Sequence, residues 1–237
     1  MDIEEKNMKK NTTFIIVAVV IIIILFVISI ATGKKGYEED LLNINYDVEG
    51  NLTSLDQYET DNPVVAMYVK DYGSIVMELY PEVAPNTVNN FISLVKSGFY
   101  DGNSFHRLMT NFVLQGGDPE GLGSGGPGYS IKGEFKSNGF ENNLSHTKGI
   151  ISMAREQDNK DSAGSQFFIV LKDSIFLDEE YASFGKVIDG WKNIEHIESS
   201  QQVANTNTGK LKKNLTIEKA LIDLKGKEYN DVEKVSE

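Results

Sequence analysis

Short runs rich in Val, Ile, Phe and Met, separated by turns that contain glycine, dominate the chain from about residue 63 to residue 225. Runs of this length and composition are typical of β-strands. Many strands with few helices favour a closed β-barrel or a β-sandwich. The predicted strands cover residues 64–69, 74–79, 112–114, 149–153, 166–171, 182–187 and 215–222.

One segment after the second predicted strand changes period and predicts an amphipathic helix. Its apolar residues follow i, i+3, i+4, i+7 spacing: Val88, Phe91, Ile92 and Val95. Pro85 suits the first helical position, and Gly98 lies where a C-terminal cap is expected. Ile194 and Ile197, close to Trp191, predict a second, shorter helix.

The N-terminal region has a different character, because no charged residue occurs between Lys10 and Lys34. About 20 apolar residues in a helix span a bilayer core of roughly 30 Å. Residues 13–32 are therefore predicted to form a transmembrane helix or uncleaved signal anchor. Cleavage near Ala31 is the alternative and would give a secreted protein. Lysines before the span favour a single-pass protein of the cell membrane with a cytoplasmic N-terminus and an extracytoplasmic domain.

These patterns divide the chain into five segments. They are a short tail (1–12), the predicted span (13–32), an acidic tether (33–62), a folded domain (63–225) and a charged C-terminal tail (226–237). A strand at 41–46 is the alternative for part of the tether, and the C-terminal tail is expected to fray. The polar stretch 199–213 favours a tolerated insertion over a binding loop.

Composition and spacing argue against several classes of function. A formal net charge of −12 disfavours nucleic acid as a partner. The chain has no cysteine, and its three histidines lack metal-ligand spacing, so we expect neither a metal nor a cofactor. Residues 121–126 formally match G-x-G-x-x-G, but proline and glycine follow where a nucleotide site needs a helix. This stretch is predicted to be a surface loop.

Arg107 is the most unusual candidate for a functional residue, because the chain has only two arginines among 23 basic side chains. This scarcity suggests that guanidinium geometry matters at position 107, beyond positive charge alone. Strand alternation places Val113 and Gln115 on one face, and puts His106 on the face opposite Phe105 and Arg107. From the residues alone, two interpretations stay open: a barrel core with one partly buried arginine, and a functional pocket.

Four segments around Arg107 carry a resemblance to a known family. They read Phe-Tyr-Asp-Gly-Asn-Ser-Phe-His-Arg (99–107), Asn-Phe-Val-Leu-Gln-Gly-Gly-Asp-Pro (111–119), Gly-Ile-Ile-Ser-Met-Ala (149–154) and Ser-Ala-Gly-Ser-Gln-Phe-Phe-Ile (162–169). With Phe-Leu-Asp at 176–178 and Phe-Gly-Lys-Val at 184–187, they resemble the cyclophilin family of peptidyl-prolyl cis-trans isomerases. The resemblance implies a mainly β fold, a closed eight-stranded antiparallel barrel capped by two α-helices, which here would follow the predicted transmembrane helix.

The resemblance also implies an activity: faster rotation of X-Pro bonds in unfolded or newly exported polypeptides, without a covalent intermediate. Arg107 would be the main catalytic residue, together with Phe112 and Gln115. The implied substrate-binding residues are Val113, Ala154, Arg155, Gln166, Phe168, Phe176, Leu177 and Tyr181. Backbone groups would supply much of the contact at positions 154 and 155. A proline-peptide binding module or holdase with little turnover is the alternative.

Three positions depart from the common family pattern. Phe176 stands where many members have tryptophan, and without an indole N–H we expect cyclosporin to bind only weakly. Tyr181 replaces a frequent histidine, and Val113 replaces a frequent methionine. The last two changes are expected to alter the preference for the residue before proline.

Overall fold

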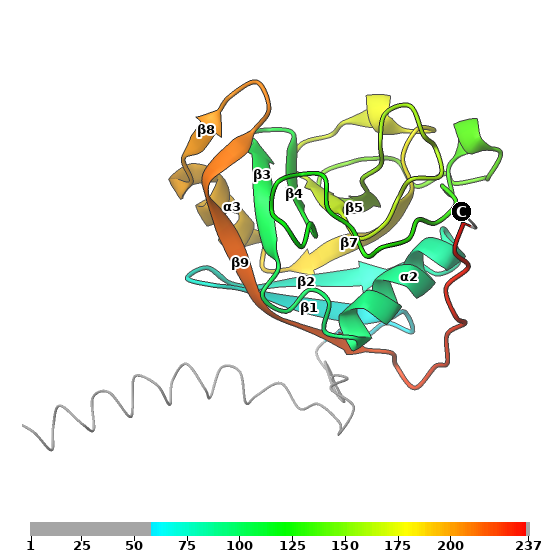
Figure 1. Cartoon of the computed structure of the whole chain (residues 1–237). Coiled ribbons are helices and arrows are strands. Elements are labelled where there is room, and N and C mark those ends of the chain that lie inside the picture. Colours follow the sequence, from blue (N-terminus) through cyan, green and yellow to red (C-terminus); the bar gives the residue numbers. More distant parts are fainter. Residues whose placement is uncertain (1–57, 236–237) are drawn as a thin grey trace, which may run out of the picture. The chain divides into compact units, whose positions relative to one another are not determined.

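Eight antiparallel strands close into a barrel in the computed structural model, which describes residues 58–235 (Figure 1). The barrel strands are β1 (Val64–Val69), β2 (Gly73–Leu79), β3 (Ser104–Met109), β4 (Val113–Gly116), β5 (Ile150–Met153), β6 (Phe167–Val170), β7 (Ser183–Asp189) and β9 (Lys210–Asp223). Their order is β1-β2-β7-β5-β6-β4-β3-β9, and β1 pairs with β9 to complete the circle. Every barrel strand therefore has two neighbours, and the closed ring has no free edge.

The closed barrel confirms one of the two architectures that the strand pattern predicted. Strand β9 begins at Lys210, earlier than predicted. Its additional residues pair with β8 (Val203–Asn205), a short strand outside the barrel. This part was hard to predict because its lysines face solvent and only Leu211 is buried. The polar stretch 199–213 is thus the end of a helix followed by a β-hairpin.

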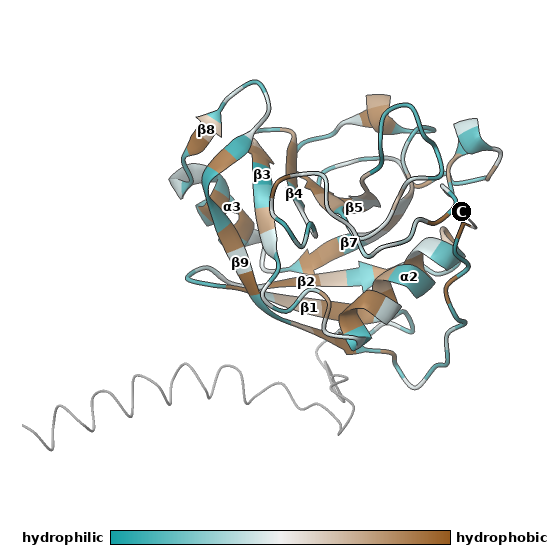
Figure 2. Cartoon of the chain, in the orientation of Figure 1, coloured by the Kyte–Doolittle hydropathy of each residue, from teal (hydrophilic) through white to brown (hydrophobic). Residues whose placement is uncertain are grey.

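Two helices pack on the barrel, as predicted. Helix α2 (Pro85–Lys96) contacts β9, and helix α3 (Trp191–Ser200) contacts β2. Pro85 does begin α2, and Gly98 adopts a φ of +71° just beyond its end. Two single turns of 3-10 helix, η1 (Lys136–Asn138) and η2 (Ile175–Leu177), lie in the connections. Figure 2 shows apolar residues along β1, β2 and α2 and polar residues in the connecting loops.

A cluster of aromatic rings fills the space between the barrel and α2. Phe91 of α2 lies within 5.1–5.3 Å, centroid to centroid, of Tyr100, Phe167 and Phe184. All three pairs are tilted or edge-on, the arrangements that aromatic quadrupoles favour. The Tyr100 hydroxyl donates to the Ser165 carbonyl at 2.9 Å, so its polar group is satisfied although the residue is buried.

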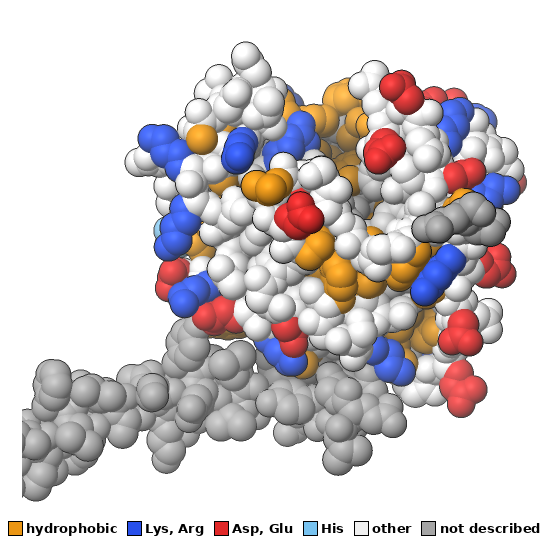
Figure 3. All heavy atoms as spheres, in the orientation of Figure 1, with side chains coloured by type: hydrophobic (Ala, Val, Ile, Leu, Met, Phe, Trp, Pro, Cys, Tyr) orange, Lys and Arg blue, Asp and Glu red, His pale blue; other side chains and the backbone are white. Residues whose placement is uncertain are grey.

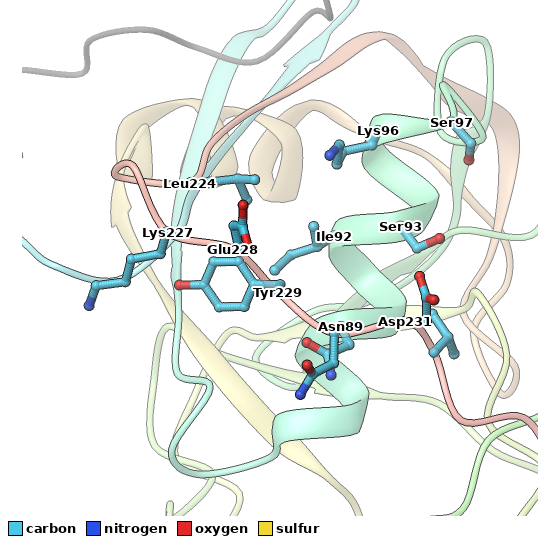
Figure 4. A pocket seen from close by; sticks show the side chains of 12 residues that line it. Asn89, Ile92, Ser93, Lys96, Ser97, Leu224, Lys227, Glu228, Tyr229 and Asp231 are labelled. Carbon is cyan, nitrogen blue, oxygen red and sulfur yellow. The ribbon is translucent and has the colours of Figure 1, made fainter.

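The C-terminal segment, which was expected to fray, instead runs along α2 as far as residue 235. Tyr229 lies beside Ile92 at the edge of a groove of about 660 Å³ (Figure 4). Asn86 and Glu233 exchange two hydrogen bonds of 2.9 and 2.8 Å, and the Val235 N–H donates to Ser130. The expectation of fraying was wrong because the charged sequence contains two residues, Tyr229 and Val232, that pack against the core.

No helix within residues 58–235 is long and apolar enough to cross a bilayer. The predicted span at 13–32, the possible strand at 41–46 and most of the tether lie outside the described residues. They stay predictions.

One close approach of backbone to backbone gives a test of the fold. Gly117 follows β4 with a φ of +87°, and a Cβ there would lie 2.3 Å from the Ser165 carbonyl oxygen. Gly117→Ala should lower the free energy of unfolding by about 2–5 kcal/mol, from left-handed strain plus overpacking. The matched control is Gly126→Ala, because a Cβ at Gly126 meets nothing within 4 Å. Urea unfolding that gave equal stabilities for the two variants would contradict this packing.

Candidate active site

A row of side chains crosses the outer face of five strands. Residues directly opposite one another on antiparallel strands share a face, and the register pairs Arg107 with Gln115, Gln115 with Phe168, and Phe168 with Ser152. Ser183 continues the row on β7. The alternation within single strands could not show that Phe168 joins Gln115, because that juxtaposition depends on the pairing between β4 and β6.

A β-bulge turns Arg107 outward. Phe105 pairs with Gly116 and Arg107 pairs with Gln115, so His106 is the extra residue in β3. Because Gly116 and Gln115 are consecutive, Phe105 and Arg107 must lie on opposite faces. Phe105 is fully buried in the core and Arg107 is half-buried on the outside. The expectation that these two residues share a face was therefore wrong.

Three contacts fix the guanidinium of Arg107. Nε donates to the Thr208 carbonyl at 2.8 Å, Nη1 donates to Gln115 Oε1 at 2.9 Å, and Nη2 lies 2.7 Å from Met109 Sδ. Burial lowers the pKa of Arg107, although a guanidinium stays charged at neutral pH. The hairpin within 199–213 thus supplies one hydrogen-bond acceptor for this arginine, the carbonyl of Thr208.

Two glutamines continue the hydrogen bonding away from Arg107. Gln115 Nε2 donates to Gln166 Oε1 at 3.0 Å, and Gln166 Nε2 donates to the Gly125 carbonyl at 2.9 Å. Since Arg107 occupies the oxygen of Gln115, the orientation of each amide in this chain is determined. The structure therefore brings together three of the predicted polar residues.

A group of apolar side chains, here called the apolar cleft, lies beside this polar chain on the same face. Its buried residues form a cluster separate from the barrel core: Val113, Ile150, Phe168, Val170 and Leu177. Phe112, Ala154 and Tyr181 pack on the cluster from the rim, and the Tyr181 ring meets Phe168 edge-on at 5.7 Å. Phe176 is 70% exposed and stacks on Phe112, with ring centroids 5.6 Å apart. The predicted apolar residues thus gather around one cleft.

Arg155 contributes differently from Arg107. Its guanidinium makes four hydrogen bonds, to the Glu180 carbonyl and carboxylate and to the carbonyls of Glu156 and Gln157. The side chain is 7% exposed and its charge lies over the Tyr181 ring at 5.0 Å. The side chain therefore holds the loop at the rim of the cleft, which leaves the predicted contact with substrate to its backbone.

Sequence patterns did not predict a trio behind Phe168, in which His146 and Ser152 are buried and Asp178 is partly exposed. His146 Nδ1 lies 2.8 Å from Asp178 Oδ1, and Nε2 lies 3.0 Å from Ser152 Oγ. The His146 ring also stacks on Phe168 with centroids 6.1 Å apart. The bonding resembles that of a hydrolytic triad, but Ser152 is fully buried. The trio therefore supports the cleft from behind, and no local motif could have revealed it.

Asp178 joins this trio to η2, which carries Phe176 and Leu177. Its carboxylate accepts hydrogen bonds from the Ser145 hydroxyl at 2.6 Å and from the His146 backbone N–H at 2.7 Å. Burial opposes ionisation of Asp178, but these hydrogen bonds outweigh it and lower the pKa. The position of the η2 wall is thus tied to the ring that supports Phe168.

The glycine loop at 121–126 is folded around a carboxylate of the chain itself. Asp118 accepts backbone hydrogen bonds from Glu120 at 2.8 Å, from Leu122 at 3.0 Å and from Gly123. No helix follows the loop, as a nucleotide-binding motif would require. The loop instead lines a cavity of about 330 Å³ that also touches Gln115, Ala154 and Gln166.

The fold and the face together define a class of site. A fixed guanidinium and two oriented amides border the apolar cleft on the outside of a closed barrel. No group of three or more metal-ligating side chains occurs among residues 58–235. The described site offers a hydrogen-bond donor beside an apolar surface, which suits a protein that binds and reshapes a peptide.

Comparison with known proteins identifies that class. The family model for cyclophilin type peptidyl-prolyl cis-trans isomerases matches residues 64–222. The chain is 48% identical over 122 residues to peptidyl-prolyl cis-trans isomerase B of Bacillus subtilis. The match covers 52% of this chain and 81% of that protein. A peptidyl-prolyl cis-trans isomerase of Helicobacter pylori is 46% identical over 115 residues, a match that covers 48% of this chain and 67% of that protein.

A solved structure agrees with these relatives. The crystal structure of a Cryptosporidium parvum cyclophilin type peptidyl-prolyl cis-trans isomerase has a TM-score of 0.61 and 30% sequence identity, covering 68% of this chain and 98% of that one. The chain belongs to the cyclophilin-type peptidyl-prolyl cis-trans isomerase family, and it is an isomerase.

The trio of His146, Ser152 and Asp178 leads to a prediction of how the free energy of unfolding depends on pH. Burial lowers the pKa of His146 from its usual 6.5. This effect is larger than the opposing effect of the Asp178 hydrogen bond and charge, which raise the pKa, so the folded state resists protonation. Below about pH 6.5 the unfolded state takes up a proton that the folded state does not. The free energy of unfolding therefore decreases as the pH is lowered. The loss is at most about 1.4 kcal/mol per pH unit for one such histidine. His106, whose pKa burial also lowers, acts in the same direction.

The variant His146→Gln isolates the contribution of His146. Urea unfolding from pH 8 to pH 5 should show the variant less stable than the wild type at high pH. The gap between them should be constant above pH 7 and should narrow below about 6.5, because only the wild type has this group to protonate. A gap that is constant over the whole range would contradict the assignment.

Proposed function

We propose that the isomerase accelerates X-Pro rotation in unfolded or newly exported polypeptides, with Arg107 as the hydrogen-bond donor to the twisting amide. Rotation about this bond breaks amide resonance, with a barrier of about 18–20 kcal/mol. Without catalysis it takes tens to hundreds of seconds. As the amide twists, the proline nitrogen becomes pyramidal and gains a lone pair. A donor fixed beside that nitrogen therefore stabilises the twisted form more than the planar one.

The observation that carries this proposal is the fixed guanidinium beside the apolar cleft. Thr208 and Gln115 hold Arg107 in one orientation, so little reorganisation is needed when the amide twists. Val113, Phe168 and Leu177 would receive the proline ring. A Cryptosporidium parvum member of the family was crystallised in the presence of the dipeptide Ala-Pro, which is consistent with this assignment.

The arginine cannot supply the whole rate enhancement. A hydrogen bond to a charged group contributes about 1.5–3 kcal/mol, and each tenfold acceleration requires about 1.4 kcal/mol. Desolvation in the cleft contributes as well, because the planar amide is more polar than the twisted one. The amides of Gln115 and Gln166 would bind the flanking peptide and orient the bond, so that no covalent intermediate is needed.

The exposed ring of Phe176 bears on inhibitor binding. It stacks on Phe112 at the rim, where it offers apolar surface but no N–H donor. We therefore expect weak cyclosporin binding with little effect on turnover. A binding module or holdase with little turnover is the rival function, and it does not require a fixed donor at Arg107.

Substitution of Arg107 tests the mechanism and separates it from the rival. Arg107→Ala should lower kcat/KM for a proline peptide by about 10- to 150-fold, the equivalent of one charge-assisted hydrogen bond. Arg107→Lys should recover little, because an ammonium cannot keep the forked contacts of a guanidinium. NMR exchange spectroscopy measures both rates, and unfolding curves check that the variants are folded. Wild-type turnover by Arg107→Ala would refute the mechanism, and peptide binding by the wild type without exchange would favour the holdase.

The cellular setting is also part of the proposal. The uncharged stretch at 13–32 supports an anchor with the isomerase domain outside the cytoplasm. Clients would then be chains that have crossed the membrane. Secretion after cleavage near Ala31 is the alternative.

Protease treatment of intact cells tests this topology. Added protease should remove the isomerase domain, and a cytoplasmic protein examined in parallel should survive. The membrane fraction should contain the full-length chain before treatment, whereas a cleaved leader would leave a shorter protein in the medium. Protection of the domain in intact cells, with loss after lysis, would reverse the assigned orientation.

A further inference from the structure

A second cavity adjoins Arg107 on the outer face of the barrel. It has a volume of about 400 Å³ and is lined by Arg107, Gln115, His106, Thr208, Lys210 and the loop at 121–123. None of the buried residues of the apolar cleft lines it. The cavity therefore lies next to the proposed catalytic donor but is not the proposed proline site.

Two positively charged side chains from neighbouring strands line this cavity. The register pairs Arg107 of β3 directly with Lys210 of β9, and like charges placed directly opposite one another destabilise a sheet. Lys210 is exposed and makes no ion pair among the described residues. Figure 3 shows several Lys and Arg side chains over this corner, near β8 and the adjoining end of β9. In a chain of net charge −12, this is a local concentration of positive charge.

The wall of the cavity also holds an unpartnered polar side chain. His106 is 5% exposed, and neither of its ring nitrogens has a hydrogen-bond partner. A buried polar group without a partner destabilises the fold. A Cβ at Gly123 of the cavity lining would lie 3.9 Å from Nε2, so the ring packs beneath this loop. Both ring nitrogens are covered, so the charges of Arg107 and Lys210, and not this ring, make the cavity suited to an anion.

Asp118, which interacts electrostatically with His106, does not pair with the positive charges of the cavity. Asp118 interacts electrostatically with His106 but directs its carboxylate to the backbone N–H groups of Glu120, Leu122 and Gly123. Asp118 does not line the cavity. The positive charges of Arg107 and Lys210 are therefore not neutralised by a carboxylate in the cavity wall.

We propose that this cavity binds the carboxylate of an aspartate or glutamate close to the proline of the substrate. The inference rests on the proposed function, because it places the proline at Arg107. An extended chain advances about 3.3–3.6 Å per residue, so a side chain within two residues of the proline can reach a cavity that Arg107 itself lines. Lys210 is then a residue that determines specificity, and acidic client segments are preferred.

Matched peptides test the proposal on the full chain. Four pairs of proline peptides differ only by Glu or Gln at one of the two positions before or the two positions after proline. On one side of the proline, kcat/KM should favour Glu by about two- to fivefold, in line with a partly exposed ion pair. Lys210→Gln should remove the preference and Lys210→Glu should reverse it. Lys212→Gln, on the same strand, is the control and should keep it, because Lys212 does not line the cavity and its ammonium group donates to Gln202.

The outcomes separate this inference from the proposed function. Turnover of all peptides with equal kcat/KM for Glu and Gln at every position would overturn the acidic preference and leave the isomerase mechanism intact. A preference that persists in Lys210→Gln would also overturn it. Failure of the wild type to turn over any of the peptides would instead contradict the proposed function.

Discussion

The pairing of β1 with β9 is the constraint on which the rest of the structure depends. It joins the first and last strands of the domain, more than 130 residues apart in the chain, and leaves the ring without a free edge. Closure gives each strand an inner and an outer face with separate tasks. The inner face packs Phe167 and Phe184 against Phe91 of α2, whereas the outer face is free to carry polar and apolar groups for binding.

The outer face becomes a site through departures from regular strand geometry. The bulge at His106 turns Arg107 away from the core that Phe105 enters. Arg107 then meets the row formed by Gln115 and Phe168, whose own positions are rigid because they belong to paired strands. Behind Phe168, the hydrogen bonds of His146 join the barrel wall to η2. Donor and apolar surface are thus supported by the same closed sheet.

Sequence patterns predicted much of this arrangement, within clear limits. The apolar period identified α2 with its first residue, and the strand-rich composition identified a barrel or sandwich. The resemblance to the cyclophilin family named the residues that line the site, but strict alternation misplaced Phe105 relative to Arg107. A bulge places one extra residue in a strand, and no residue type is required at that position, so the alternation of faces cannot predict it. The partnership of His146 with Asp178 was equally hidden, because the two are 32 positions apart and meet only after the barrel closes.

The hairpin between β8 and β9 gives this architecture a means of variation. Its Thr208 carbonyl holds Nε of Arg107, although the hairpin is polar, projects from the barrel and supplies no residue to the apolar cleft. Surface hairpins tolerate insertions and deletions far better than barrel strands do. A change in the length of this hairpin would therefore tilt the guanidinium while leaving the cleft unaltered. Related enzymes could diverge in turnover while keeping the same affinity for proline, through a segment whose variability would otherwise be dismissed as neutral.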